Sequence, residues 1–245
     1  LALMLALLAP THAFATSHVL IVLNQDSQPK YFLNDPKQRG LCGDIYAELK
    51  SRLANKGITL SIQSTYTPIK RIMQKLKTGS AQAYCGAGRN AEREKKYYFS
   101  NVPLYSVSNV LIARSYKKTG PTSFEEMESS QSKMGTYFGT STDRFLKNRG
   151  NINIVKSFYT LNKAFTALDQ KKIDYFYYHD LALNYYLRNS TQKLRVLPTK
   201  FRTYNHWMIY SKSMHKHARD LMDKELTDMV QSGLIEQFHR KYRVK

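Results

Sequence analysis

Short apolar runs alternate with segments of helical periodicity along the first part of the chain. Residues 18–23 are an apolar run followed by a turn-rich stretch, which is typical of a buried strand that leads into a loop. Residues 44–53 and 68–76 carry apolar side chains at helical spacing, and 58–62 and 81–85 are expected to be strands. This alternation predicts an α/β fold built on a mostly parallel sheet with flanking helices.

A second series of the same kind begins at residue 107. A strand is expected at 107–113, and after the loop 115–122 the capping-box pattern of residues 123–126 indicates the start of a short helix. The remaining expected elements are strands at 134–138, 152–155 and 173–178, helices after the turn 139–142 and around 161–168, a returning strand at 203–210 and a final helix over 218–230. Two such series predict two α/β lobes.

The first fifteen residues have the pattern of a secretory signal. Residues 1–9 are an unbroken apolar run, and Ala13-Phe14-Ala15 is a pattern that a signal peptidase would cleave after Ala15. The basic residues that usually precede such a run are missing before Leu1, so we expect the sequence to begin inside the signal peptide. The run has about half of the roughly 20 residues needed to span a bilayer, so we expect an exported, soluble protein.

The composition is that of a globular, strongly basic protein. Hydrophobic residues make up 42% and aromatic residues 12% of the chain, and the formal net charge is +20. A charge of this sign predicts attraction to an acidic partner, which could be nucleic acid, anionic lipid or polysaccharide, or a small carboxylate. The basic residues are scattered, and no RNA-binding aromatic motif or zinc-finger spacing occurs, so we do not expect binding to nucleic acid.

Other chemistry is poorly represented. Cys42 and Cys85 could form a disulfide in an oxidising compartment or remain two buried thiols. Ser141, His179 and an aspartate could be combined into a catalytic triad, but no G-x-S-x-G elbow supports one. The histidines at 215 and 217 would point in different directions on a helix, so no metal and no cofactor is expected.

The stretch CGAGRNAEREKKYYFS, residues 85–100, places small residues before a dense patch of charge. A turn of this kind can present an arginine to a carboxylate, because a guanidinium offers two parallel donors. Gly86 and Gly88 would let backbone N–H groups approach the same anion closely. The alternative is a solvated, charged helix end, with Arg89 and Arg93 both on the surface.

Six segments in a particular order carry a family resemblance. They are GDIYAELKSRL, PIKRIMQKLKTGSAQA, GAGRNAEREKKYYFSNVPLYS, MGTYFGTSTDRFL, LNKAFTALDQKKIDYFYYHD and LTDMVQSGLIEQFHRKY. This order resembles the periplasmic solute-binding proteins of family 3, the amino-acid-type receptors of ABC importers. The resemblance implies a type II periplasmic-binding-protein fold, in which two lobes joined by two strands close over a ligand. It divides the chain into a signal peptide, 1–15, lobe 1, 16–106 and 207–245, and lobe 2, 107–206.

The resemblance also implies a ligand site. Arg93, six residues before Phe99-Ser100, would bind the ligand carboxylate, and Ser141 would add a second contact from lobe 2. For Ser141 the alternative is simple N-capping of the helix that follows the turn.

The remaining site positions depart from the family. The acid that would receive a ligand ammonium falls on His179 or on Asp180, and Ile69 stands where the family has an aromatic side chain. Asp26 could contact a basic side chain of the ligand, and the missing aromatic ring could come from Tyr31, Tyr66 or Tyr105.

We therefore expect a monomeric periplasmic protein that captures a small carboxylate-bearing solute, an amino acid, for the membrane permease of an ABC importer and catalyses no reaction. Two alternatives remain open. One is an enzyme of the dehydratase type on the same fold, and the other is a basic envelope module that binds acidic polymers and would lose affinity steeply with salt.

Overall fold

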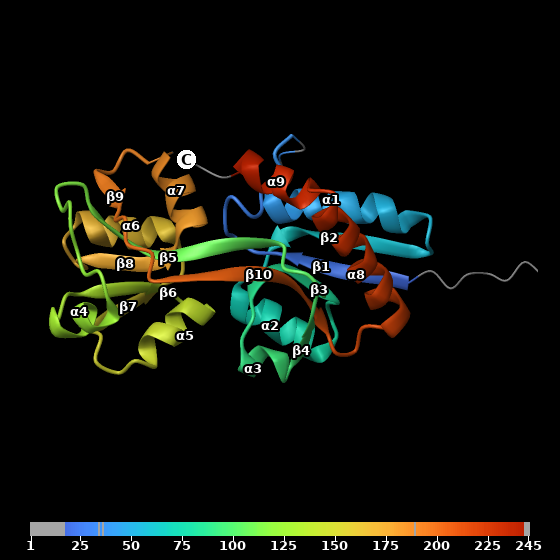
Figure 1. The fold of residues 1–245 in the computed structure, drawn as a ribbon, viewed down its shortest axis with the longest axis horizontal. Coiled ribbons are helices and arrows are strands. Elements are labelled where there is room, and N and C mark those ends of the chain that lie inside the picture. The colour runs from blue at the N-terminus through green and yellow to red at the C-terminus, as the bar shows by residue number, and fades with distance from the viewer. Residues whose placement is uncertain (1–17, 34, 36, 189, 243–245) are drawn as a thin grey trace, which may run out of the picture.

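The computed structural model describes residues 18–33, 35, 37–188 and 190–242. The expected signal peptide, residues 1–15, lies outside this part of the chain. Within it, the chain forms a curled, mixed sheet of ten strands with helices on both faces (Figure 1).

The strands define two lobes. They are β1 (His18–Asn24), β2 (Ile58–Tyr66), β3 (Ala83–Gly88), β4 (Tyr97–Phe99), β5 (Tyr105–Arg114), β6 (Met134–Tyr137), β7 (Ile154–Phe158), β8 (Tyr175–His179), β9 (Leu194–Val196) and β10 (Arg202–Ser211). The helices are α1 (Leu41–Ala54), α2 (Ile69–Thr78), α3 (Ala91–Glu94), α4 (Phe124–Ser129), α5 (Ser141–Lys147), α6 (Leu161–Asp169), α7 (Asp180–Arg188), α8 (Lys216–Gln231) and α9 (Leu234–Tyr242). The strand order is β2-β1-β3-β10-β5-β8-β6-β7, with β4 paired to β10 and β9 paired to β5.

Lobe 1 has helices on both faces of its sheet. α1, α8 and α9 pack together on one face, and α2 packs on the other (Figure 1). The amphipathic helix α2 follows Pro68 and ends before Gly79, whose φ of 77° lies in the left-handed region that favours glycine. The apolar faces of these helices bury one core that includes Leu49, Ile72 and Leu226.

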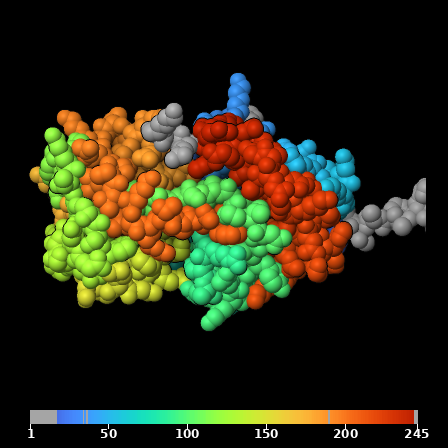
Figure 2. Space-filling model, in the orientation of Figure 1, coloured from blue at the N-terminus to red at the C-terminus, as the bar shows by residue number. Residues whose placement is uncertain are grey.

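Lobe 2 repeats this arrangement on its own core. β8, β6 and β7 run parallel, with α6 and α7 over one face and α4 and α5 over the other (Figure 1). One hydrophobic cluster contains Phe165 and Leu183, and a second contains Met127 and Leu146. In Figure 2 the lime, yellow and orange segments of lobe 2 gather on one side of the molecule and the blue, cyan and red segments of lobe 1 on the other.

Two long antiparallel strands, β5 and β10, run through both lobes. They pair with each other from Arg202 opposite Asn109 to His206 opposite Tyr105. Beyond this stretch β10 continues in lobe 1 beside β3 and β4, and β5 continues in lobe 2 beside β8 and β9. The chain therefore crosses between the lobes twice, and the carboxyl ends of β1, β3, β6 and β8 meet at the boundary.

Most of the predicted elements are present, and the structure adds some that were not predicted. The helix expected over 218–230 is α8, and a further helix that was not predicted, α9, follows Gly233, whose φ is 75°. Helix α7 and the three-residue strands β4 and β9 were not predicted. No helix in the described ranges is long and apolar enough to cross a membrane.

Candidate functional site

A small cavity lies between the lobes, at the carboxyl ends of β1, β3, β6 and β8. In open α/β sheets this is the usual place for a ligand. The cavity measures about 30 Å³, close to the volume that one molecule occupies in liquid water. A solute larger than a water molecule would fit among these residues only if the lobes move apart. The lining residues are Gln25, Lys30, Ile69, Tyr84, Gly86, Ala87, Gly88, Arg93, Thr140, Ser141, Thr142, Tyr178, His179, Tyr204 and His206.

The glycines of β3 allow close packing at this cavity. Gly86 has a φ of 89°, and a Cβ there would lie 2.5 Å from the hydroxyl of Tyr105 and 3.1 Å from Cδ of Lys30. A Cβ at Gly88 would lie 3.2 Å from the ring of Tyr204. Both predicted glycines therefore line the site, and each also makes room for a neighbouring side chain as well as for an anion.

Arg93 lies in α3, directly beyond β3. Its Nη1 donates to the carbonyl of Gly88 at 2.7 Å, and its backbone N–H donates to the capping side chain of Asn90. No carboxylate pairs with it among the described residues, and burial lowers its pKa. By contrast, the side chain of Arg89 is 46% exposed and bonds Glu94 at 2.5 Å, so Arg89 is a surface residue.

A second cation, Lys30, lines the cavity beside Arg93. Lys30 is 2% exposed, and its Nζ donates to Oε1 of Gln25 at 3.2 Å and to the hydroxyl of Tyr84 at 3.3 Å. Burial, helped by the charge of Arg93, lowers the pKa of Lys30 to about 7. Lys30 was not predicted from the sequence; its only signal is its position in the loop after the first strand.

Two buried histidines complete the polar lining. Nδ1 of His179 accepts the backbone N–H of Ala182 at 3.2 Å, so in the neutral ring the proton resides on Nε2. His206, which was also missed, has Nδ1 3.2 Å from the hydroxyl of Tyr105. Burial, together with the charge of Lys30, holds the pKa of both histidines well below the usual value, so both are neutral near pH 7.

Ser141 faces the cavity from α5 with its hydroxyl free for a ligand contact. The N-cap of α5 is Thr140, whose hydroxyl accepts the N–H of Asp143 at 3.1 Å, so the capping role considered for Ser141 belongs to its neighbour. Oγ of Ser141 would lie 3.6 Å from a Cβ on Gly88, which places it directly across the boundary between the lobes.

The structure does not bring Asp180 or Asp26 to the cavity. The carboxylate of Asp180 accepts the backbone N–H groups of Ser108 at 3.0 Å and Leu181 at 2.8 Å, and it lines a separate hollow. Asp26 is exposed and accepts from the side-chain amide of Gln28 at 3.2 Å. Of the two candidates for an ammonium partner, the residue that reaches the cavity is therefore His179.

Apolar and aromatic side chains close the remaining walls. Ile69, at the start of α2, is 8% exposed and lines the cavity as expected. The rings at the cavity belong to Tyr84, Tyr178 and Tyr204. The three tyrosines expected from the sequence, Tyr31, Tyr66 and Tyr105, do not line it.

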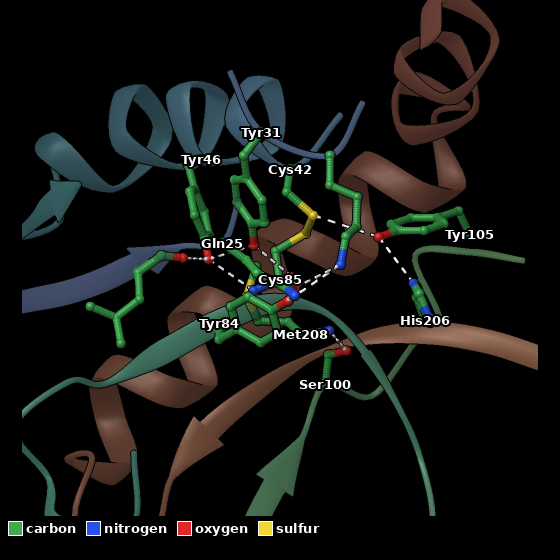
Figure 3. The surroundings of a disulfide bond; sticks show 12 residues. Gln25, Tyr31, Cys42, Tyr46, Tyr84, Cys85, Ser100, Tyr105, His206 and Met208 are labelled. Atoms are coloured by element: carbon green, nitrogen blue, oxygen red, sulfur yellow. Dashed lines mark hydrogen bonds between the residues drawn. A yellow bond between two sulfur atoms is a disulfide. The ribbon is translucent and has the colours of Figure 1, made fainter. Parts of the chain in front are cut away.

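A disulfide joins Cys42 of α1 to Cys85 of β3 behind the cavity (Figure 3). The hydroxyl of Tyr31 donates to the carbonyl of Cys85 at 2.6 Å, and that of Tyr46 accepts its N–H at 2.8 Å. Sγ of Cys42 lies 3.7 Å from the hydroxyl of Tyr105. This layer fixes β3 immediately before the two glycines.

Catalytic groups are not assembled here. Ser141 and His179 both line the cavity, but the described lining contains no aspartate or glutamate that could complete a triad. No cluster of three metal-ligating side chains occurs in the part of the chain that the structure describes.

Comparison with sequences places the chain in one family. A model of the bacterial extracellular solute-binding proteins, family 3, matches residues 19–245. No curated protein matches.

Solved structures agree on the fold. An arginine-binding protein mutant from T. maritima superposes with a TM-score of 0.77 at 19% identity, covering 92% of this chain and 95% of that one. An amino acid ABC transporter substrate-binding protein from Streptococcus pneumoniae, bound to L-arginine, gives 0.75 at 18% identity, covering 93% and 95%. An ancestral amino-acid-binding precursor of cyclohexadienyl dehydratase gives 0.75 at 19% identity, covering 91% and 94%. The expected two-lobe, type II periplasmic-binding fold is confirmed.

Proposed function

Because the chain belongs to the bacterial extracellular solute-binding proteins of family 3, we propose that it captures a small carboxylate-bearing solute between its two lobes. The observation that carries this proposal is Arg93. Arg93 is partly buried at the boundary between the lobes and has no carboxylate partner among the described residues, and a ligand carboxylate would give it two charge-assisted hydrogen bonds.

Capture would work by closure. We place lobe 1 at residues 16–106 and 207–245 and lobe 2 at 107–206, with β5 and β10 as the hinge. Contacts between the lobes already exist, including the ion pair of Glu92 with Arg144 and the hydrogen bond from Tyr186 to Gln28. A solute that touches both lobes would stabilise the closed form over the open one, and no bond need be made or broken.

The proposed role in transport is based on the roles of proteins with similar structures. The S. pneumoniae protein is named as the substrate-binding protein of an amino acid ABC transporter, and several similar structures are arginine-binding proteins. We extend this role to the present chain as a monomeric periplasmic receptor for an amino acid or related carboxylate, which a membrane permease then takes up.

A thermal-shift experiment tests the proposal. The purified protein is screened against amino acids, small dicarboxylates and short peptides, and a solute at about 100 times its Kd should add about 2.7 kcal/mol of stability. Arg93→Ala should weaken binding at least about 30-fold, because removing one partner of a buried charge pair costs about 2 kcal/mol or more.

Arg89→Ala is the matched control, because this exposed arginine is already paired with Glu94. It should bind like the wild type, and the solute should be recovered unchanged after incubation. If no small solute shifts the melting point and the protein is instead retained on anionic polymer at low salt, solute capture is wrong and the polymer-binding alternative takes its place.

A further inference from the structure

We propose that the site recognises a small dicarboxylate by its two anionic ends, one at Arg93 and the other at Lys30 and His179, and that it does not recognise an ammonium group. This inference rests on the proposed function and names the class of its solute. Acidic amino acids and dicarboxylates without an amino group share this chemistry.

The first support is the charge of the lining. Arg93 and Lys30 both face the cavity, and neither has a carboxylate partner among the described residues. The described lining holds no aspartate or glutamate at all. A buried lysine and a partly buried arginine without counter-charges favour a ligand that brings negative charge to each of them, so a ligand with two negative groups fits the site better than one with a single carboxylate.

The second support is a buried donor without an acceptor. Nε2 of His179 has no hydrogen-bond partner in the part of the chain that the structure describes, and the residue is 2% exposed. Because Nδ1 accepts from Ala182, Nε2 carries the proton in the neutral ring and can only donate. Buried polar groups are nearly always paired, so this N–H calls for an acceptor oxygen on the solute.

An ammonium group needs hydrogen-bond acceptors or a negative charge, and this end of the cavity offers a donor and a positive charge. It has only donors, so it cannot pair with the Nε2–H of His179, and Lys30 would repel it. The adjacent acid, Asp180, is already bonded to two backbone N–H groups outside the cavity. Oε1 of Gln25 already accepts from both Lys30 and Tyr84.

A ligand series tests the two-ended recognition. Dissociation constants are measured by calorimetry for glutarate, succinate, L-glutamate, L-glutamine, L-arginine and butyrate. Glutarate or succinate should bind at least about 30-fold more tightly than butyrate, because the second carboxylate gains a buried charge partner. Removing the amino group of glutamate to give glutarate should change the affinity less than about tenfold, which corresponds to 1.4 kcal/mol.

The outcomes separate this inference from the proposed function. If L-glutamine or L-arginine binds more tightly than every dicarboxylate and depends on Arg93, solute capture stands and the two-ended recognition is overturned. A gain of more than about tenfold from the amino group of glutamate also overturns it. If none of the six probes binds, the two-ended recognition fails, and the wider thermal-shift screen decides whether solute capture stands.

Two substitutions at His179 distinguish the contact of Nε2 with the solute from the hydrogen bond that Nδ1 accepts from the N–H of Ala182. In His179→Asn the side-chain oxygen takes the place of Nδ1, so the bond from Ala182 is kept and the inward donor is lost. In His179→Gln the amide nitrogen takes the place of Nε2, so the donor is kept and the bond from Ala182 is lost. The Asn variant should melt like the wild type and bind glutarate about tenfold or more weakly, whereas the Gln variant should melt lower and keep most of the affinity. Wild-type affinity in the Asn variant overturns the role of His179.

Lys30→Met tests the other contact at the same end. This variant should weaken the binding of glutarate and leave the weak binding of butyrate almost unchanged, because butyrate uses only Arg93. Lys50→Met, at an exposed position of α1, removes the same charge outside the cavity and should leave both affinities unchanged. Equal losses for glutarate and butyrate in Lys30→Met would show that both carboxylates share one end, which contradicts the proposal.

Discussion

Lys30 makes ligand binding sensitive to pH at the scale of a single residue. Its pKa of about 7 in the free protein means that it is only partly charged at neutral pH. A carboxylate bound beside it favours the charged form and raises that pKa, so binding takes up a proton between pH 7 and the raised value. The groups that face Lys30 in the cavity are Gln25, Tyr84, Arg93, His179 and His206, and none of them is an acid that would hold its proton in the absence of ligand.

The affinity for glutarate should therefore fall as the pH rises from 7 to 9. Calorimetry at pH 8 in two buffers of different ionisation enthalpy should report proton uptake on binding. Lys30→Met should abolish both the uptake and most of the pH dependence in this window. Proton release, or an affinity that rises with pH, would contradict this assignment.

The sequence predicted those site residues whose signal is local. Arg93, Gly86 and Gly88 belong to one short motif that includes the end of a strand, and all three line the cavity. Lys30 and His206 were missed because nothing near them in the chain marks them; they become site residues only when β1 and β10 are packed beside β3.

The choice between His179 and Asp180 could not be made from sequence either. Successive side chains at the end of a strand point to opposite sides. If the predicted end of the strand is wrong by one residue, Asp180 faces the cavity in place of His179. In the structure β8 extends to His179 and α7 begins at Asp180, and the carboxylate of Asp180 bonds backbone N–H groups outside the cavity.

At the scale of elements, the disulfide ties α1 to β3. It closes a loop with a sequence separation of 43 residues. Closing a loop of this length lowers the conformational entropy of the unfolded chain, which stabilises the folded state by about 4 kcal/mol. Replacing Cys42 and Cys85 together by alanine should lower the free energy of unfolding by about 2–4 kcal/mol, measured by urea denaturation. The wild type should lose a similar amount under strong reducing agents, and the double variant should not respond to them.

The approach of β3 to lobe 2 gives a second prediction at this scale. A Cβ at Gly88 would press on the ring of Tyr204, so Gly88→Ala should hinder closure and weaken ligand binding with little effect on the melting of the free protein. Gly57→Ala is a control with the opposite pattern. Gly57 has a φ of 71° with open space around it, so alanine there should cost roughly 1 kcal/mol of stability and leave binding unchanged. Equal affinity losses in the two variants would contradict a specific effect at the boundary.

Most elements were predictable, and the three-residue strands were not. The strands at 18–24, 58–66 and 105–114 and the helix at 69–78 have clear periodicity and lie within a few residues of the expected ranges. The three-residue strands β4 and β9 are too short to show any period and exist only because β10 and β5 offer them a partner.

At the scale of the whole molecule, the net charge of +20 should act on the rate of capture. A positive field over the protein attracts an anionic solute before contact, and salt screens it beyond about 10 Å at 0.1 M. The association rate constant for glutarate, measured by stopped flow, should fall about tenfold or more between low salt and 0.5 M salt, while the dissociation rate changes little. An association rate that is independent of salt would leave the charge unrelated to capture.

The double crossing of β5 and β10 also determines the order in which a newly made chain can finish folding. β3 lies between β1 and β10, but β10 is synthesised only after β5 to β9. Until then lobe 1 presents the open side of β3, an unpaired strand edge of the kind that favours association with other chains. Lobe 2 is continuous in sequence and completes its own strands first. Lobe 1, whose synthesis begins first, is thus completed last. A nascent chain arrested before residue 202 keeps the open side of β3 exposed.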